Sequence, residues 1–294
     1  MISPLNKLST AKFPFSFQTI VLAAIVWGVL ALLFYLLCSV PIEVDGVSRR
    51  PDWYVIGTYV FKQVAYLGAA VLCFRNWRSP TIISARNLWL GIGFGMLSYL
   101  LGNLILGYWE LVLHQEPILS PADLFFVGIY LFLGWSMILA VSSRRLNLDR
   151  WQWLLVVGIG LIGIVLAIAT SRETANLPPP VVSASAWVSL LQQSVKLFYI
   201  VGDILLLIIA TMLLLAFWGG RFAQSWRMIA AAVFSLYIAD MWLKYAENHI
   251  EKYQSGSLLE VFSVFSGVLF AIGAAVEYEI SSRSRREKSG RRRA

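Results

Sequence analysis

The chain has 294 residues, of which 59% are hydrophobic and 14% are charged, and its formal net charge is +8. Soluble proteins carry about 25% charged residues, so this composition, with a mean hydropathy of +0.71, excludes a soluble globular protein and favours an integral membrane protein. The positive charge does not indicate nucleic-acid binding, because the Lys and Arg residues fall in short connections and a C-terminal tail, as in the basic cytoplasmic segments of membrane proteins.

Runs of about 20 apolar residues predict eight membrane-spanning helices with mostly short connections between antiparallel neighbours. No small-x-small cleavage site follows the first run, so we expect this span to be retained rather than removed as a signal peptide. The sequence predicts an all-α polytopic membrane helix bundle, with a cytoplasmic segment at 1–17, a membrane domain at 18–280 and a basic cytoplasmic tail at 281–294. The predicted spans cover residues 18–40, 53–74, 87–109, 121–142, 151–171, 194–218, 227–246 and 257–280.

The first three spans contain one charged residue deep in the membrane and one packing signal. Lys62 lies about 14 Å along the second span, near the middle of the bilayer. The third span contains "GIGFG", in which Gly91 and Gly95 have the small-xxx-small spacing that allows helices to approach closely. Packing within the bundle is favoured over a homodimer interface. The eighth span repeats this spacing at Gly267, Ala271 and Ala275.

The later spans contain acidic residues in apolar surroundings, where a charge costs about 3 kcal/mol or more at the membrane centre. Asp123 is at the start of the fourth span, Asp203 lies in "YIVGDILLL" of the sixth, and Glu260 is one turn into the eighth. The seventh span contains "ADMWLKYA", in which Asp240 and Lys244 lie on the same helix face. We expect these two residues to form an intrahelical ion pair, with Lys62 and Asp203 as a second couple. 

The distribution of the 24 Lys and Arg residues predicts the orientation. Most of them fall before the first span, in the connections that follow the second, fourth and sixth spans, and after the eighth span. Positive residues mark cytoplasmic segments, so we expect both termini in the cytoplasm. Cys38 and Cys73 then fall at opposite membrane faces, about 30 Å apart, which excludes a disulfide between them.

In this orientation the charged residues within the spans gather in the outer half of the membrane, and the inner half has almost none until the helix ends. Two interpretations stay open. The charges pair with one another or reach water, and only aid assembly. Alternatively, the helices converge on a polar cavity open to the outer face, because charges within membranes commonly mark functional sites. The candidate ligand-binding residues are Lys62, Asp123, Asp203, Asp240, Lys244 and Glu260.

Several kinds of chemistry have no support in the sequence. The only histidines, His114 and His249, lie in predicted outer loops, which excludes haem ligation by paired histidines within the bundle. There is no HExxH, G-x-S-x-G or P-loop motif. Asp203 and Asp240 are a conceivable intramembrane aspartyl protease pair, but the contexts "GDIL" and "ADMW" do not match that family. We therefore predict no catalytic residues, no metal site and no cofactor.

Three segments carry a resemblance to a known family: "LSPADLFFVGIYLFLGWSMI" at 119–138, "LFYIVGDILLLIIATMLLL" at 197–215 and "YIADMWLKYAENHIEKYQSGSLLEVFSVFSGVLFAIGAA" at 237–275. They resemble spans of the multi-pass N-terminal region of bacterial GGDEF-type signalling proteins, over a little more than half of the chain. The resemblance implies a membrane sensory module and places Asp123, Asp203, Asp240 and Glu260 at the family's acidic positions. In those proteins a cyclase or kinase domain follows the last span, whereas fourteen mostly polar residues follow it in this sequence.

The sequence-based hypothesis is a non-enzymatic sensor or interaction module in a bacterial inner (plasma) membrane. It would bind a small ligand, lipid or partner helix in the outer half and signal to a separate cytoplasmic partner. The alternative is a transporter or channel for a small solute, which needs a polar route to both sides. The few charges of the inner half argue against that alternative. Membrane lipids are the expected surroundings, and the oligomeric state is left open.

Overall fold

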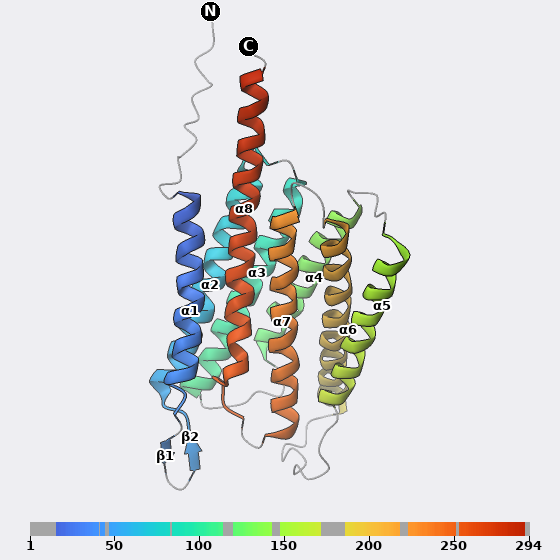
Figure 1. The fold of residues 1–294 in the computed structure, drawn as a ribbon. Coiled ribbons are helices and arrows are strands. Elements are labelled where there is room, and N and C mark those ends of the chain that lie inside the picture. Colours follow the sequence, from blue (N-terminus) through green and yellow to red (C-terminus); the bar gives the residue numbers. More distant parts are fainter. Residues whose placement is uncertain are drawn as a thin grey trace, which may run out of the picture.

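Eight long helices form the bundle in the computed structural model, and each is long and apolar enough to cross a membrane. The structure describes residues 16–40, 42–44, 47–82, 84–113, 120–142, 148–171, 186–217, 223–250 and 253–291. Helices that follow one another in the chain run in opposite directions (Figure 1). The predicted all-α polytopic bundle is confirmed. The helices are α1 (Phe17–Leu37), α2 (Asp52–Arg78), α3 (Arg86–Tyr108), α4 (Pro121–Ser142), α5 (Arg150–Ser171), α6 (Ala186–Ala216), α7 (Ala223–His249) and α8 (Val261–Arg291).

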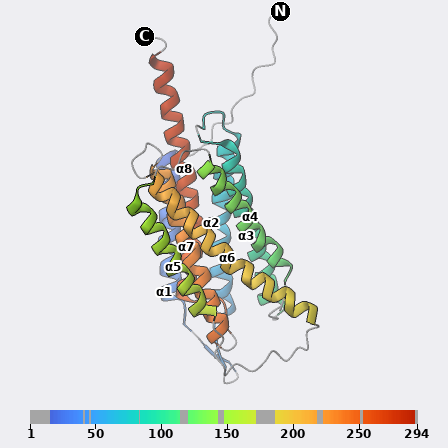
Figure 2. The same ribbon diagram turned by 90° about the vertical axis from the view of Figure 1, so that its right-hand side faces the viewer.

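Two helices are longer than the apolar pattern predicts. α6 begins at Ala186 rather than at 194, and it crosses the bundle at a slant (Figure 2), so a longer helix is needed for the same depth. α8 continues to Arg291, so most of the predicted basic tail extends the last span. An i,i+4 ion pair of 2.6 Å between Arg283 and Glu279 supports this extension.

Short elements occur at or between the long helices. Strands β1 (Ile42–Val44) and β2 (Val47–Arg49) form an antiparallel hairpin between α1 and α2. A π-helical segment, η1 (Trp109–Leu113), follows α3, and a 3-10 turn, η2 (Leu258–Glu260), precedes α8. We call the end of the bundle with β1 and β2 the hairpin end and the opposite end, where α1 begins and α8 finishes, the termini end (Figure 1).

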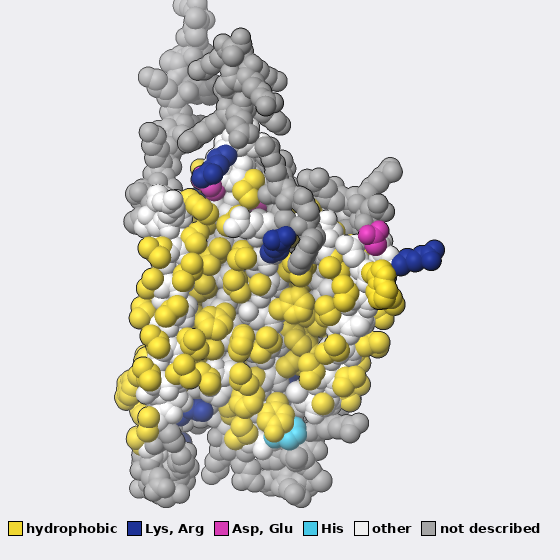
Figure 3. All heavy atoms as spheres, viewed as in Figure 1, with side chains coloured by type: hydrophobic (Ala, Val, Ile, Leu, Met, Phe, Trp, Pro, Cys, Tyr) yellow, Lys and Arg dark blue, Asp and Glu magenta, His cyan; other side chains and the backbone are white. Residues whose placement is uncertain are grey.

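The core centres on α8, which packs against α7, α2 and α1, while α3 packs against α2 and α4. A methyl group on Gly91 would lie 2.0 Å from Ser136 Oγ, and one on Gly267 would lie 2.9 Å from Ala65 Cβ. The small-residue spacings therefore serve contacts between helices of the same chain, as predicted. Large apolar side chains such as Leu22 and Leu161 are exposed, and yellow apolar side chains cover the visible flank of the bundle (Figure 3). This surface suits the acyl chains of lipid.

The antiparallel arrangement makes the predicted orientation testable. Reporter fusions after residues 80, 147, 223 and 290 are expected to be cytoplasmic, and fusions after 46, 115, 178 and 252 external, because successive helix ends alternate between the two ends of the bundle. The measurement is a paired phosphatase and fluorescence reporter assay at each site. A full inversion of all eight signals would reverse the orientation, and one inverted pair would mean that a helix does not cross.

Candidate functional site

The six candidate residues do not meet at one point. The structure divides them between two separate groups. The first, the Lys62 cluster, consists of Lys62, Glu260, Tyr253, Gly256 and Ser257. The second, the aspartate cluster, consists of Asp203, Asp240, Lys244 and Tyr130. Asp123 lies beside the second group at the start of α4.

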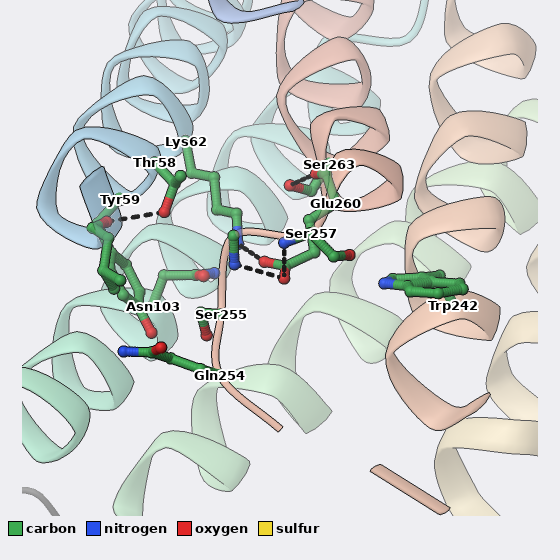
Figure 4. A network of polar contacts seen from close by, with 12 residues as sticks. Thr58, Tyr59, Lys62, Asn103, Trp242, Gln254, Ser255, Ser257, Glu260 and Ser263 are labelled. Carbon is green, nitrogen blue, oxygen red and sulfur yellow. Dashed lines mark hydrogen bonds and ion pairs between the residues drawn. The ribbon is translucent and has the colours of Figure 1, made fainter. Parts of the chain in front are cut away.

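In the Lys62 cluster, α2 is joined to the start of α8 by a buried ion pair. Lys62 Nζ lies 2.6 Å from Glu260 Oε2, and the two side chains are 9% and 6% exposed. Lys62 reaches from α2 towards Glu260, with Thr58 and Tyr59 on the same helix and Ser257 next to the carboxylate (Figure 4). The predicted couple between Lys62 and Asp203 is wrong, because α2 packs against α8 whereas α6 packs against α4, α5 and α7.

The second oxygen of Glu260 caps the turn that opens α8. Oε1 accepts hydrogen bonds from the backbone N–H groups of Gly256 at 2.7 Å and Ser257 at 3.0 Å, and from the Tyr253 hydroxyl. These contacts satisfy donors that a helix start leaves without partners. Burial and the neighbouring Glu260 carboxylate raise the pKa of Tyr253, so its hydroxyl is a neutral donor at physiological pH.

Further contacts hold the chain segment before α8. The Tyr54 hydroxyl donates to the Gly256 carbonyl at 2.6 Å. Gly256 has φ of +105°, and a Cβ there would lie 2.7 Å from the Tyr54 ring, so glycine is required at this position. Glu110, in η1, accepts from the Tyr59 hydroxyl at 2.7 Å and from the Ser255 backbone N–H at 3.1 Å. The Lys62 cluster thus pairs its two charges with each other and fixes the α7–α8 connection on α2.

The aspartate cluster joins three helices. Lys244 of α7 forms its ion pair with Asp203 of α6, which is 3% exposed. The Tyr130 hydroxyl of α4 lies 2.8 Å from Asp203 Oδ1 and 3.3 Å from Asp240 Oδ2. The predicted intrahelical pair of Asp240 with Lys244 is therefore wrong. α6 packs against this face of α7 and supplies a closer carboxylate.

Two carboxyl groups in the aspartate cluster share one ammonium group and one hydroxyl. A tyrosine hydroxyl has a single proton to donate, and it lies nearer to Asp203, which also holds Lys244. Asp240, which is half-buried, has the longer Tyr130 contact and lies beside the Asp203 carboxyl group. With both carboxyl groups ionised, the cluster carries one more negative than positive charge. In low dielectric, such an excess is unfavourable without a proton or another positive group.

Asp123 is a helix cap. Its Oδ2 accepts from the Ser120 backbone N–H at 2.9 Å, and its Oδ1 accepts from the Tyr199 hydroxyl of α6 at 2.8 Å. The Ser120 hydroxyl in turn accepts from the Ala122 N–H at 3.1 Å. Asp123 and Glu260 therefore share a capping contact, since each is the acidic third residue after a serine that starts a helix, and Glu260 has its ion pair with Lys62 in addition.

Two further hydroxyls, those of Tyr66 and Ser266, are buried in the core. They lie near each other and make no hydrogen bond of good geometry among the described residues. Tyr66 stacks on Tyr99 with ring centroids 4.1 Å apart, and the charge of Asp240 acts on both rings.

Glu277 is a buried acidic residue that the sequence-based hypothesis left out of the candidate site. It lies near the termini end of α8 and is 0% exposed. The sequence places it beside Glu279, close to the end of the predicted span, where a carboxylate ordinarily reaches water. The prediction allowed ionisable groups at the inner helix ends, and Glu277 is such a group, but its burial was not predicted. The helical period offered a signal, because Glu277 is one turn after Gly273 on the apolar face of α8.

No family model, no curated protein and no solved structure matches the chain. The resemblance to the membrane regions of GGDEF-type signalling proteins stays a prediction. His114 and the connection at 172–185 lie outside the described residues. Among the described residues, no group of three or more His, Cys, Asp or Glu side chains is placed to hold a metal ion. The charges of the Lys62 cluster are paired with each other, whereas the aspartate cluster has two carboxyl groups for one ammonium group. The aspartate cluster is therefore the candidate functional site.

Proposed function

We propose that the chain is a membrane sensor or interaction module whose aspartate cluster binds a small ligand with a positively charged group. The observation that carries this proposal is the charge imbalance: Asp203 and Asp240 face one ammonium group, that of Lys244, and one hydroxyl, that of Tyr130. A cationic ligand beside Asp240 would replace the missing positive charge. The Lys62 cluster, in which every charge has close partners, serves as the rigid support of this site.

The position of the site suits the transmission of a signal along the bundle. Asp203 lies on α6 and Asp240 on α7, so a ligand bound to both would change how these helices pack. α7 packs closely on α8 near the termini end, where the Ser225 hydroxyl donates to the Gly273 carbonyl at 3.1 Å. A shift of α7 would reach the basic extension of α8, which in the predicted orientation faces a separate cytoplasmic partner. The resemblance to sensory membrane regions agrees with this direction of signalling.

The ligand class is tested on the purified full chain in lipid nanodiscs by thermal unfolding with choline, ethanolamine and putrescine as probes. A probe at about 100 times its Kd stabilises the folded state by about 2.7 kcal/mol, so at least one amine should raise the melting temperature of the wild type. Asp240→Asn keeps the shape and removes the charge, and it should abolish this rise. Lys196→Gln, an exposed position on α6, is the matched control. A rise that persists in Asp240→Asn would contradict the proposed site.

A transporter for a small cation is the second candidate. Glu277 favours it, because buried carboxyl groups then lie in both halves of the bundle, as a route for cations requires. Reconstitution in liposomes separates the two candidates. Uptake of a radiolabelled amine that the wild type shows, and that Asp240→Asn and Glu277→Gln both lose, would support transport. Binding without uptake would support the sensor.

A further inference from the structure

Glu277 is the most deeply buried carboxyl group among the residues that the structure describes at the termini end. Its side chain belongs to α8 and is 0% exposed, as are Ser225 of α7 and Ser281 of α8. Its Oε1 lies 3.5 Å from the Ser281 hydroxyl, and its Oε2 has no hydrogen-bond partner among the described residues. The hydroxyls of Ser84, Ser225 and Ser281 and the Ser84 backbone are its polar neighbours. The group is thus enclosed by three segments of the chain.

No positive side chain is paired with this carboxyl group among the described residues. Arg75 of α2 lies over the Tyr278 ring, 4.2 Å from its centroid, and Arg283 is paired with Glu279. Arg227 of α7 is exposed. In the part of this end that the structure describes, Arg78 lies over the Trp77 ring, Arg86 donates to the Trp77 carbonyl, Arg285 donates to the Pro80 carbonyl, and Arg150, at the start of α5, is exposed. Cys73 of α2 is buried, and Tyr278 of α8 is half-buried.

The free-energy cost of burying an unpaired charge decides the protonation state of Glu277. An isolated carboxylate removed from water loses its hydration, and uptake of one proton removes the charge altogether. A protonated carboxyl group also changes the hydrogen-bond count. It gains an O–H donor, while the opposite oxygen continues to accept from serine hydroxyls. The Ser84 hydroxyl accepts a hydrogen bond from Trp89 Nε1 at 2.8 Å. Its own proton therefore points to another acceptor, and the neighbouring Glu277 carboxyl group can be that acceptor.

We propose that Glu277 is a proton-binding site, carried as the neutral acid at neutral pH and exchanging its proton with water at the termini end. The step is a proton transfer alone: hydronium gives a proton to the carboxylate and becomes water, so that one O–H bond of hydronium breaks as an O–H bond forms on Oε2. Deprotonation would place a negative charge between α7, α8 and the α2–α3 connection. The contact of Ser225 with Gly273 lies one turn away, so the charge would loosen this contact. This site is independent of the aspartate cluster and of its proposed ligand.

The test is infrared spectroscopy of the full chain in nanodiscs at neutral pH, in the region of protonated carboxyl groups. Glu277→Gln should lose one band that the wild type shows. The matched control, Glu279→Gln, removes a neighbouring carboxylate that is paired with Arg283 and should lose none. Ser225→Ala keeps Glu277 and removes one hydroxyl beside it, so the same band should shift in frequency. This variant provides a test even where Glu277→Gln fails to assemble.

Three outcomes would overturn the proposal. The first is a spectrum of Glu277→Gln that equals that of the wild type in this region. The second is a band in the wild type that Ser225→Ala leaves unmoved. The third is a band that disappears when sodium chloride replaces N-methylglucamine chloride at constant pH, which would assign the site to a sodium ion. As a second measurement, raising the pH should lower the melting temperature of the wild type relative to Glu277→Gln. In the wild type, the folded state binds a proton at Glu277 that the unfolded state releases, so a higher pH favours unfolding. Glu277→Gln lacks this proton.

Discussion

Lys62→Met is expected to lower the free energy of unfolding by about 3–5 kcal/mol. The substitution leaves Glu260, which is 5% exposed, without the ammonium group at 2.6 Å from its Oε2. Three donors remain on the other oxygen, from Tyr253, Gly256 and Ser257, but none of them neutralises the charge. The measurement is equilibrium unfolding of the purified protein in mixed micelles.

The double variant Lys62→Met with Glu260→Gln separates a lost charge pair from lost packing. It should regain part of the stability, because neither charge is then buried alone. Glu260→Gln alone should lower stability less than Lys62→Met. Glutamine keeps a side-chain oxygen that accepts the hydrogen bonds at η2, and the Lys62 ammonium group still faces the polar segment between α7 and α8. Lys196→Met, at an exposed position on α6, is the control and should change stability by less than about 0.5 kcal/mol. Equal stability of Lys62→Met and the wild type would mean that water solvates Glu260.

The sequence predicts the helices far better than the contacts between them. Apolar length alone decides whether a segment can cross a bilayer, and all eight predicted spans overlap helices of the structure. The partners of the charged residues depend on which helices are neighbours. Lys244 reaches Asp203 because α6 packs against α7, and Lys62 reaches Glu260 because α2 packs against α8. A uniformly apolar helix surface contains little information about its neighbours, since lipid and protein are both apolar.

Two of the six candidate residues carried a local signal that points to helix capping. "SPAD" at 120–123 and "SLLE" at 257–260 both match a serine followed three residues later by an acid, the pattern of a helix start. The bonds of Asp123 to the Ser120 N–H and of Glu260 to the Ser257 N–H agree with this pattern. The acidic positions that carry the family resemblance are, at these two points, explained by helix capping.

The aspartate cluster gives the second large effect, because its two acidic residues should respond in opposite ways to the same substitution. Asp203→Asn removes the partner of Lys244 and leaves an unpaired ammonium group on a side chain that is 16% exposed, which should lower the free energy of unfolding by about 3 kcal/mol. Asp240→Asn removes the carboxyl group that has no ammonium of its own, so stability should stay equal or rise. Both substitutions keep side-chain shape, so packing does not account for a difference between them.

Lys244→Met supplies the decisive comparison, because it leaves Asp203 and Asp240 facing each other with only the Tyr130 hydroxyl between them. It should be the least stable single variant of this cluster at neutral pH. Adding Asp240→Asn to Lys244→Met should recover stability, since one of two repelling carboxylates is removed, and lowering the pH should do the same by protonating a carboxyl group. The measurement is thermal unfolding in nanodiscs at two pH values. If Asp240→Asn alone costs as much as Asp203→Asn, Asp240 is itself part of a charge pair, and the excess negative charge that supports cation binding does not exist.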